Sequence, residues 1–126
     1  MADRKRILVA DDDPDLLDLL KMDLAHQGYE ILAAANGKDA LQIAMVEKLD
    51  LILLDVMMPY IDGYHVAYEV TNKLGNKAPH IMLMTSRDTA REKGIALMSG
   101  AEDVFQKPFE MAQLHDKITE ILGKAA

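Results

Sequence analysis

The sequence predicts an α/β domain in which helices cover both faces of a five-stranded parallel sheet. Short apolar runs alternate with segments whose apolar residues have helical spacing. The runs at 51–54 (LILL) and 81–84 (IMLM) are apolar on both faces, as expected for strands buried beneath two helical layers. Repeated strand–helix units also require crossover connections, which join parallel strands. These observations together favour a doubly wound fold.

Each element follows from a local pattern. The predicted strands are the apolar runs at 6–10, 30–34, 51–54, 80–84 and 103–106. Helices are predicted where apolar residues recur every three, four or seven positions, at 17–24, 40–44, 67–74 and 111–121, with a weaker pattern containing Gly94 at 88–98. Gly28 and Gly75 follow the first and third helical patterns, where glycine commonly ends a helix.

Length and composition limit the possible functions. The 126 residues, half hydrophobic and 28% charged, predict a single domain over 1–126 with a sizeable core. A net charge of -7 argues against direct nucleic acid binding, which needs cations to neutralise phosphates. Without cysteine, disulfides and thiolate metal sites are excluded. The apolar runs are too short for a membrane span or a signal peptide, so we expect a cytoplasmic protein without a membrane partner.

Polar residues gather where the predicted strands end. Asp11 and Asp12 follow the first strand, Asp55 the third, Thr85 the fourth and Lys107 the fifth. In open α/β sheets, ligands bind beyond the carboxyl ends of the strands. We therefore expect these carboxylates, one hydroxyl and one ammonium to converge on a single edge of the sheet.

The acidic residues have two possible roles. Asp13 precedes Pro14, the preferred order of a helix cap and a first helical residue, so Asp13 is interpreted as an N-cap. Asp11, Asp12 and Asp55 would form a cluster of carboxylates that a hard divalent cation such as Mg²⁺ would neutralise. The alternative is that they are solvated loop acids, and their spacing alone does not separate the two readings.

The set of strand-end residues also fits phosphoryl chemistry. A carboxylate can act as a nucleophile towards phosphorus and form an aspartyl phosphate. The transferring group carries negative charge, which a metal ion, a lysine and a hydroxyl would stabilise. Taken singly, Thr85 is equally explained as a cap for the helix that starts near Asp88, and Lys107 as a surface lysine.

The sequence resembles the receiver domain of two-component response regulators over essentially its whole length. The matching segments are ILVADDDP, LDLILLDVMMPYIDGY, IMLMTSR, SGAEDVFQKPF and the NG before the second predicted helix. The resemblance implies the flavodoxin-like strand order 2-1-3-4-5. It also implies a module that accepts a phosphoryl group from a histidine kinase and switches conformation, rather than a turnover enzyme.

The resemblance implies a role for each matching residue. Asp55 corresponds to the phosphoacceptor. Asp12 corresponds to a direct Mg²⁺ ligand, Asp11 to a ligand acting through water, and the backbone carbonyl of Met57 to a further ligand.

Two residues correspond to the groups that hold the phosphoryl oxygens. Thr85 matches the switch hydroxyl, and Lys107 matches the ammonium. The Lys107–Pro108 peptide matches one that is usually cis in the family. Arg87 either reaches the phosphoryl oxygens or points to solvent. The implied partners are a sensor histidine kinase or phosphotransfer protein, and an output domain or target contacting the face formed by 88–98, 103–106 and 111–121.

One position departs from the family pattern. Val104 stands where an aromatic residue is usual, and Phe105 is no substitute because neighbouring strand residues point to opposite faces. Three rival functions fit the sequence less well. A haloacid-dehalogenase-type phosphatase would need a second acid at Met57, a flavin-binding protein would not place three aspartates at its phosphate loop, and a degenerate receiver would lack the intact set of site residues.

Overall fold

The computed structural model describes residues 4–87 and 89–123, so Asp88, at the start of the predicted helix 88–98, lies outside the described residues. The elements in chain order are β1 (Arg6–Ala10), α1 (Pro14–His26), β2 (Glu30–Ala34), α2 (Gly37–Val46), β3 (Leu51–Asp55), α3 (Gly63–Leu74), a 3₁₀ turn (Gly75–Lys77), β4 (His80–Thr85), α4 (Thr89–Met98), β5 (Asp103–Gln106) and α5 (Met111–Leu122).

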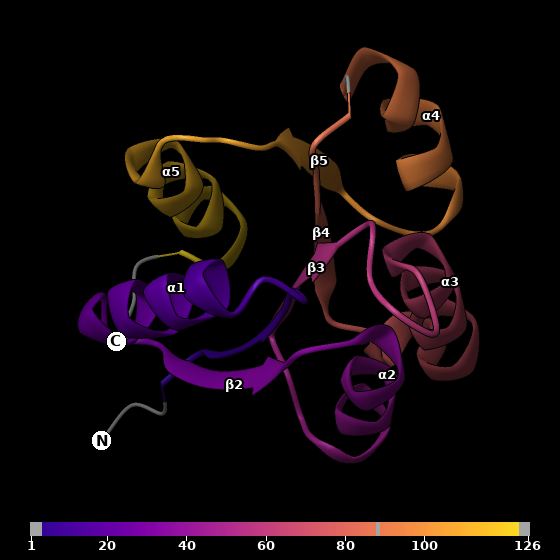
Figure 1. The fold of residues 1–126 in the computed structure, drawn as a ribbon. Coiled ribbons are helices and arrows are strands. Elements are labelled where there is room, and N and C mark those ends of the chain that lie inside the picture. The colour runs from indigo at the N-terminus through magenta and orange to yellow at the C-terminus, as the bar shows by residue number, and fades with distance from the viewer. Residues whose placement is uncertain (1–3, 88, 124–126) are drawn as a thin grey trace.

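All five strands pair in parallel in the order β2-β1-β3-β4-β5, which confirms the predicted doubly wound topology. The helices α1 and α5 lie on one face of the sheet, and α2, α3 and α4 lie on the other (Figure 1). In the register of the sheet, Leu8 of β1 stands between Leu32 of β2 and Ile52 of β3. The carboxyl ends of the strands therefore meet at one edge.

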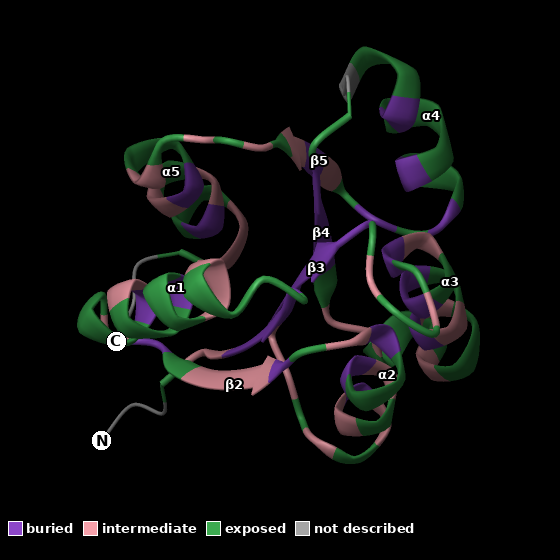
Figure 2. Cartoon of the chain, in the orientation of Figure 1, coloured by how far each residue is buried: buried purple, intermediate pink, exposed green. Residues whose placement is uncertain are grey.

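The alternation of side chains along the strands gives each face of the sheet its own apolar core. Beneath α1 and α5 lie strand residues Ile7, Val9, Leu51 and Leu53 and helix residues Leu20, Leu24, Leu114 and Ile118. Beneath α2 and α3 lie Leu8, Ile52 and Leu54 with residues of those helices. The central strand β3 is buried along its whole length, and β4 is buried after its first residue, as Figure 2 shows in purple. Burying each such large side chain contributes roughly 1.5–3 kcal/mol.

The strand boundaries of β1, β2 and β5 are as predicted, β3 and β4 differ slightly, and α1, α2 and α3 each begin earlier than their predicted apolar patterns. β3 continues through Asp55 and β4 through Thr85, one residue beyond the predicted ends. The reason is that both residues stay in register with the neighbouring strand, Asp55 beside Met84 and Thr85 beside Gln106. The site residues on these strands are thus held by the sheet itself.

The predicted faces of β5 are also confirmed. Val104 is buried on the face covered by α2, α3 and α4, whereas Phe105 packs on the opposite face, against Phe109 with ring centroids 5.7 Å apart. No helix in the described ranges 4–87 and 89–123 is long and apolar enough to cross a bilayer.

Candidate functional site

The three consecutive aspartates between β1 and α1 lie in three different environments. Asp13 caps α1, with its carboxylate accepting hydrogen bonds from the backbone N–H groups of Asp15 (3.0 Å) and Leu16 (3.4 Å), as predicted. Asp11 is fully buried and accepts a 2.9 Å hydrogen bond from the backbone N–H of Asp13. Asp12, between them, is exposed.

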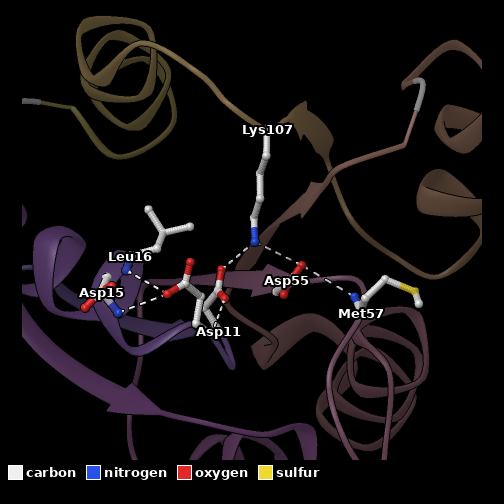
Figure 3. Close-up of polar contacts among 7 residues, drawn as sticks. Asp11, Asp15, Leu16, Asp55, Met57 and Lys107 are labelled. Carbon is white, nitrogen blue, oxygen red and sulfur yellow. Dashed lines mark hydrogen bonds and ion pairs between the residues drawn. The ribbon is translucent and has the colours of Figure 1, made fainter.

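Lys107 brings the ends of three strands together. Its ammonium lies 2.7 Å from Asp11 Oδ2 and 3.3 Å from Asp55 Oδ1, and Figure 3 shows the side chain reaching from β5 to a point between the two carboxylates. Its backbone N–H donates a 2.7 Å hydrogen bond to the carbonyl of Thr85. The Lys107–Pro108 peptide is cis, as the resemblance implied. Lys107 is therefore a bridging cation, and the surface-lysine reading is wrong.

The three predicted carboxylates form one cluster. Asp11, Asp12 and Asp55 each place an oxygen so that all three atoms lie within 4.8 Å of one another. Within the described part of the chain, Asp12 makes no hydrogen bond or ion pair, so its oxygens are available to a ligand. One ammonium against three carboxylates leaves uncompensated negative charge. Oxygen donors in this number and spacing suit a hard divalent cation such as Mg²⁺.

Burial and the neighbouring charges shift the pKa values of Asp55 and Lys107. Burial, followed by repulsion from Asp11, raises the pKa of Asp55 from 3.8 to about 6, although Lys107 and the Met57 N–H oppose the rise. Burial acts against the Lys107 ammonium, but its pairing with Asp11 and Asp55 prevails and raises its pKa above the ordinary value. Lys107 therefore stays charged at neutral pH, while Asp55 holds its charge less readily than an ordinary aspartate.

Thr85 and Met57 lie at the edges of this cluster. Thr85 is fully buried, and its hydroxyl oxygen accepts a 3.0 Å hydrogen bond from the backbone N–H of Arg87. The backbone N–H of Met57 donates a long, 3.4 Å hydrogen bond to Asp55 Oδ1, while the Met57 side chain is exposed. Among the described residues, no hydrogen bond joins the Thr85 hydroxyl to Asp55 or to the Lys107 ammonium.

The N-terminus of α3 holds the loop after Asp55 close to β3. Asp62 is the N-cap of α3, accepting a 2.8 Å hydrogen bond from the His65 N–H, and Gly63 is the first helical residue. A Cβ atom on Gly63 would lie 2.5 Å from the backbone oxygen of Asp55. Glycine is therefore needed here for close approach to the phosphoacceptor candidate.

Arg87 does not simply point to solvent. Its guanidinium lies 3.5 Å from the carboxylate of Glu92 on α4 and 3.3 Å from the sulfur of Met57. Glu92 is buried, which sequence reasoning missed. A glutamate in a weakly patterned, charged helix is ordinarily solvent-facing, so the local sequence carries no signal for it.

Comparison with known proteins gives a consistent result. The family model of the response regulator receiver domain matches residues 7–119. The alkaline phosphatase synthesis transcriptional regulatory protein PhoP of Bacillus subtilis is 35% identical over 121 residues, 96% of this chain and 50% of the relative. The probable transcriptional regulator ycf27 of Cyanophora paradoxa is 40% identical over 122 residues, 96% and 49% respectively. The chain thus spans about half the length of these relatives.

Solved structures agree. The response regulator TrrA of Thermotoga maritima, in a complex with Mg²⁺ and BeF, superimposes with a TM-score of 0.83 at 37% identity, covering 94% of this chain and 99% of that one. The chemotaxis protein CheY4 of Vibrio cholerae superimposes with a TM-score of 0.88 at 27% identity, covering 95% and 100%. The chain belongs to the receiver domain family of the response regulators of two-component signalling systems.

Proposed function

We propose that the whole chain, residues 1–126, acts as a single receiver domain that accepts a phosphoryl group on Asp55 from a histidine kinase or phosphotransfer protein. The observation that carries this proposal is the partly buried Lys107 ammonium, placed between Asp11 and Asp55 at the carboxyl edge of the sheet. An arriving phosphoryl group brings negative charge to a position where Asp11 and Asp55 already hold a cation in place.

In the proposed transfer, a carboxylate oxygen of Asp55 attacks the phosphorus of a phosphohistidine. A phosphorus–oxygen bond forms as the phosphorus–nitrogen bond breaks, and the bond pair stays on the imidazole nitrogen, which takes up a proton. Lys107 then pairs with one phosphoryl oxygen. The Thr85 hydroxyl donates a hydrogen bond to another, which requires it to turn from its present contact with the Arg87 N–H.

The carboxylates of Asp12 and Asp55, the Met57 carbonyl and, through water, Asp11 would hold Mg²⁺. When bound, Mg²⁺ supplies positive charge opposite the phosphoryl oxygens. Support comes from the three carboxylate oxygens within 4.8 Å of one another, and from the rise of the Asp55 pKa, which burial causes first and repulsion from Asp11 second. The TrrA structure, named as a complex with Mg²⁺ and BeF, provides a parallel in a relative.

Receiver domains of response regulators are signalling modules rather than turnover enzymes, and we assign this chain no turnover activity of its own. A phosphatase acting through Asp55 would need a general acid two residues later, where the neutral side chain of Met57 stands. The proposed output is an attached domain or a separate target that contacts the face formed by α4, β5 and α5, in the cytoplasm.

The test is phosphoryl uptake from a small acyl phosphate, followed by intact mass measurement with and without Mg²⁺. One phosphoryl group per chain is expected, only in the presence of Mg²⁺. Asp55→Asn should abolish uptake, and Asp50→Asn, which alters an aspartate at the opposite end of the sheet bonded to the Arg6 N–H, should retain it. Uptake at the wild-type rate by Asp55→Asn would sink the assignment.

A further inference from the structure

The buried face of α4 carries a carboxylate beside one small apolar residue, whereas α1 and α5 bury large apolar side chains. Among positions 90–99, the buried residues are Glu92 and Ala96 of α4 and Ser99 just past the helix, and the Ser99 hydroxyl donates to the Ala96 carbonyl. The large apolar side chains of α4, namely Ile95, Leu97 and Met98, are half or more exposed. Figure 2 accordingly shows α4 as mostly green. Little apolar burial therefore holds α4 in place, so its position depends on its polar contacts.

Glu92 is the critical contact, because a buried carboxylate is costly unless a cation lies beside it. Within the described ranges, the cation at ion-pair distance is Arg87, with Nη1 3.5 Å from Glu92 Oε1. The other neighbour is Tyr64 of α3, where burial and then Glu92 raise the pKa to about 12. The Tyr64 hydroxyl and Glu92 Oε1 are both buried without a hydrogen-bond partner in the described structure. Arg87 is thus the main compensation for the Glu92 charge.

The same arginine is tied to the candidate phosphoryl site. The Arg87 backbone N–H donates a hydrogen bond to the Thr85 hydroxyl oxygen. Its guanidinium Nη2 lies 3.3 Å from the Met57 sulfur. Met57 in turn contacts Asp55 through its backbone N–H. The Arg87 side chain is also 54% exposed, so it has room to change its partner.

We propose that Glu92 is a positioning residue that holds Arg87 away from the phosphoryl site, so that phosphorylation and the docking of α4 compete for this one guanidinium. The inference rests on the proposed phosphoacceptor function of Asp55. A phosphoryl group on Asp55 would bring two or more anionic oxygens close to the Arg87 backbone. These oxygens attract the guanidinium more strongly than the single Glu92 carboxylate, which lies 3.5 Å away. When Arg87 turns to these oxygens, the Glu92 carboxylate is left buried beside the neutral Tyr64 hydroxyl without a cation. The helix α4 then moves away from the sheet, because this exposes the carboxylate to water.

Reciprocity makes this competition measurable. If binding at Asp55 breaks the Arg87–Glu92 pair, the pair opposes binding, so removing the Glu92 charge must strengthen binding there. Glu92→Gln keeps the shape and removes the charge. We expect it to bind beryllofluoride about fivefold more tightly with Mg²⁺ present, at the low end of coupling between sites. Wild-type amides of 92–98 should exchange hydrogen faster on beryllofluoride binding, and those of Glu92→Gln should barely respond.

The controls separate this role from a purely structural one. Glu110→Gln removes an exposed carboxylate that has no side-chain capping bond, and it should match wild type in both measurements. Arg87→Gln leaves Glu92 uncompensated, so its α4 amides should exchange fast even without beryllofluoride. The double variant Arg87→Gln, Glu92→Gln should show non-additive changes in affinity.

Equal beryllofluoride affinity and equal α4 response in wild type and Glu92→Gln would overturn the inference while leaving Asp55 as the phosphoacceptor. If Glu92→Gln does not fold, slow α4 exchange in Arg87→Gln overturns it instead. Failure of wild type to bind beryllofluoride at all would refute the proposed function, and the inference with it.

Discussion

Replacing Asp55 by asparagine is expected to stabilise the fold at neutral pH when no divalent cation is present. Asp55 is only 5% exposed, and burial followed by repulsion from Asp11 raises its pKa from 3.8 to about 6, despite the attraction of Lys107. In the unfolded chain the carboxyl regains its ordinary pKa. Folding therefore disfavours the ionised form of Asp55, and a neutral amide of the same size avoids that cost.

The magnitude follows from the pKa change. A rise from 3.8 to about 6 corresponds to about 3 kcal/mol between the two protonation states. Because the folded pKa is the higher one, protonated Asp55 contributes this stability in full below pH 3.8, and it is lost as the pH rises through about 6. Asparagine has no such dependence. The variant should exceed wild type by about 2–3 kcal/mol at neutral pH, and the difference should vanish near the ordinary pKa.

Urea unfolding in the presence of a chelator, at neutral pH and again near pH 4, measures both free energies. The matched control is Asp18→Asn, an exposed acid on α1, which should stay within about 0.5 kcal/mol of wild type. Lys107 keeps its 2.7 Å contact with Asp11 in the Asp55 variant, so the ammonium is not left unpaired. An unfolding free energy for Asp55→Asn equal to or below that of wild type at neutral pH would refute the reasoning.

Three further outcomes are expected. Mg²⁺ at about 100 times its dissociation constant should stabilise wild type by about 2.7 kcal/mol. In thermal melts, Asp12→Ala should lose most of that gain. Equal Mg²⁺-dependent shifts in the two proteins would contradict the assignment of Asp12 as a ligand. Asp13→Ala removes the cap of α1 and should cost about 1 kcal/mol in urea unfolding, whereas an unchanged free energy would show that the cap bonds contribute nothing. Beryllofluoride should shift the backbone amides of 86–94 more than those of 103–106, because Val104 is buried and cannot turn as an aromatic ring can; the reverse ranking in NMR spectra would disprove this.

The fold was predictable from the sequence because its signals are local. Both-sided apolar runs such as 51–54 identify buried parallel strands, and Asp13 before Pro14 identifies the start of a helix. Strand ends in a parallel sheet share one edge, so the convergence of Asp11, Asp55 and Lys107 also followed from residue order. The strand order itself came from resemblance, since periodicity does not say which strands are neighbours.

Tertiary structure decided what each site residue does within that frame. Asp11 and Asp12 are adjacent and chemically identical, yet packing buries the first against Lys107, 96 positions away in sequence, and leaves the second exposed for a ligand. Glu92 gave no local sign of burial, because its environment comes from α3 and the loop before α4 rather than from its own helix. Burial and charge pairing depend on contacts between distant segments, and these exist only once the chain has folded.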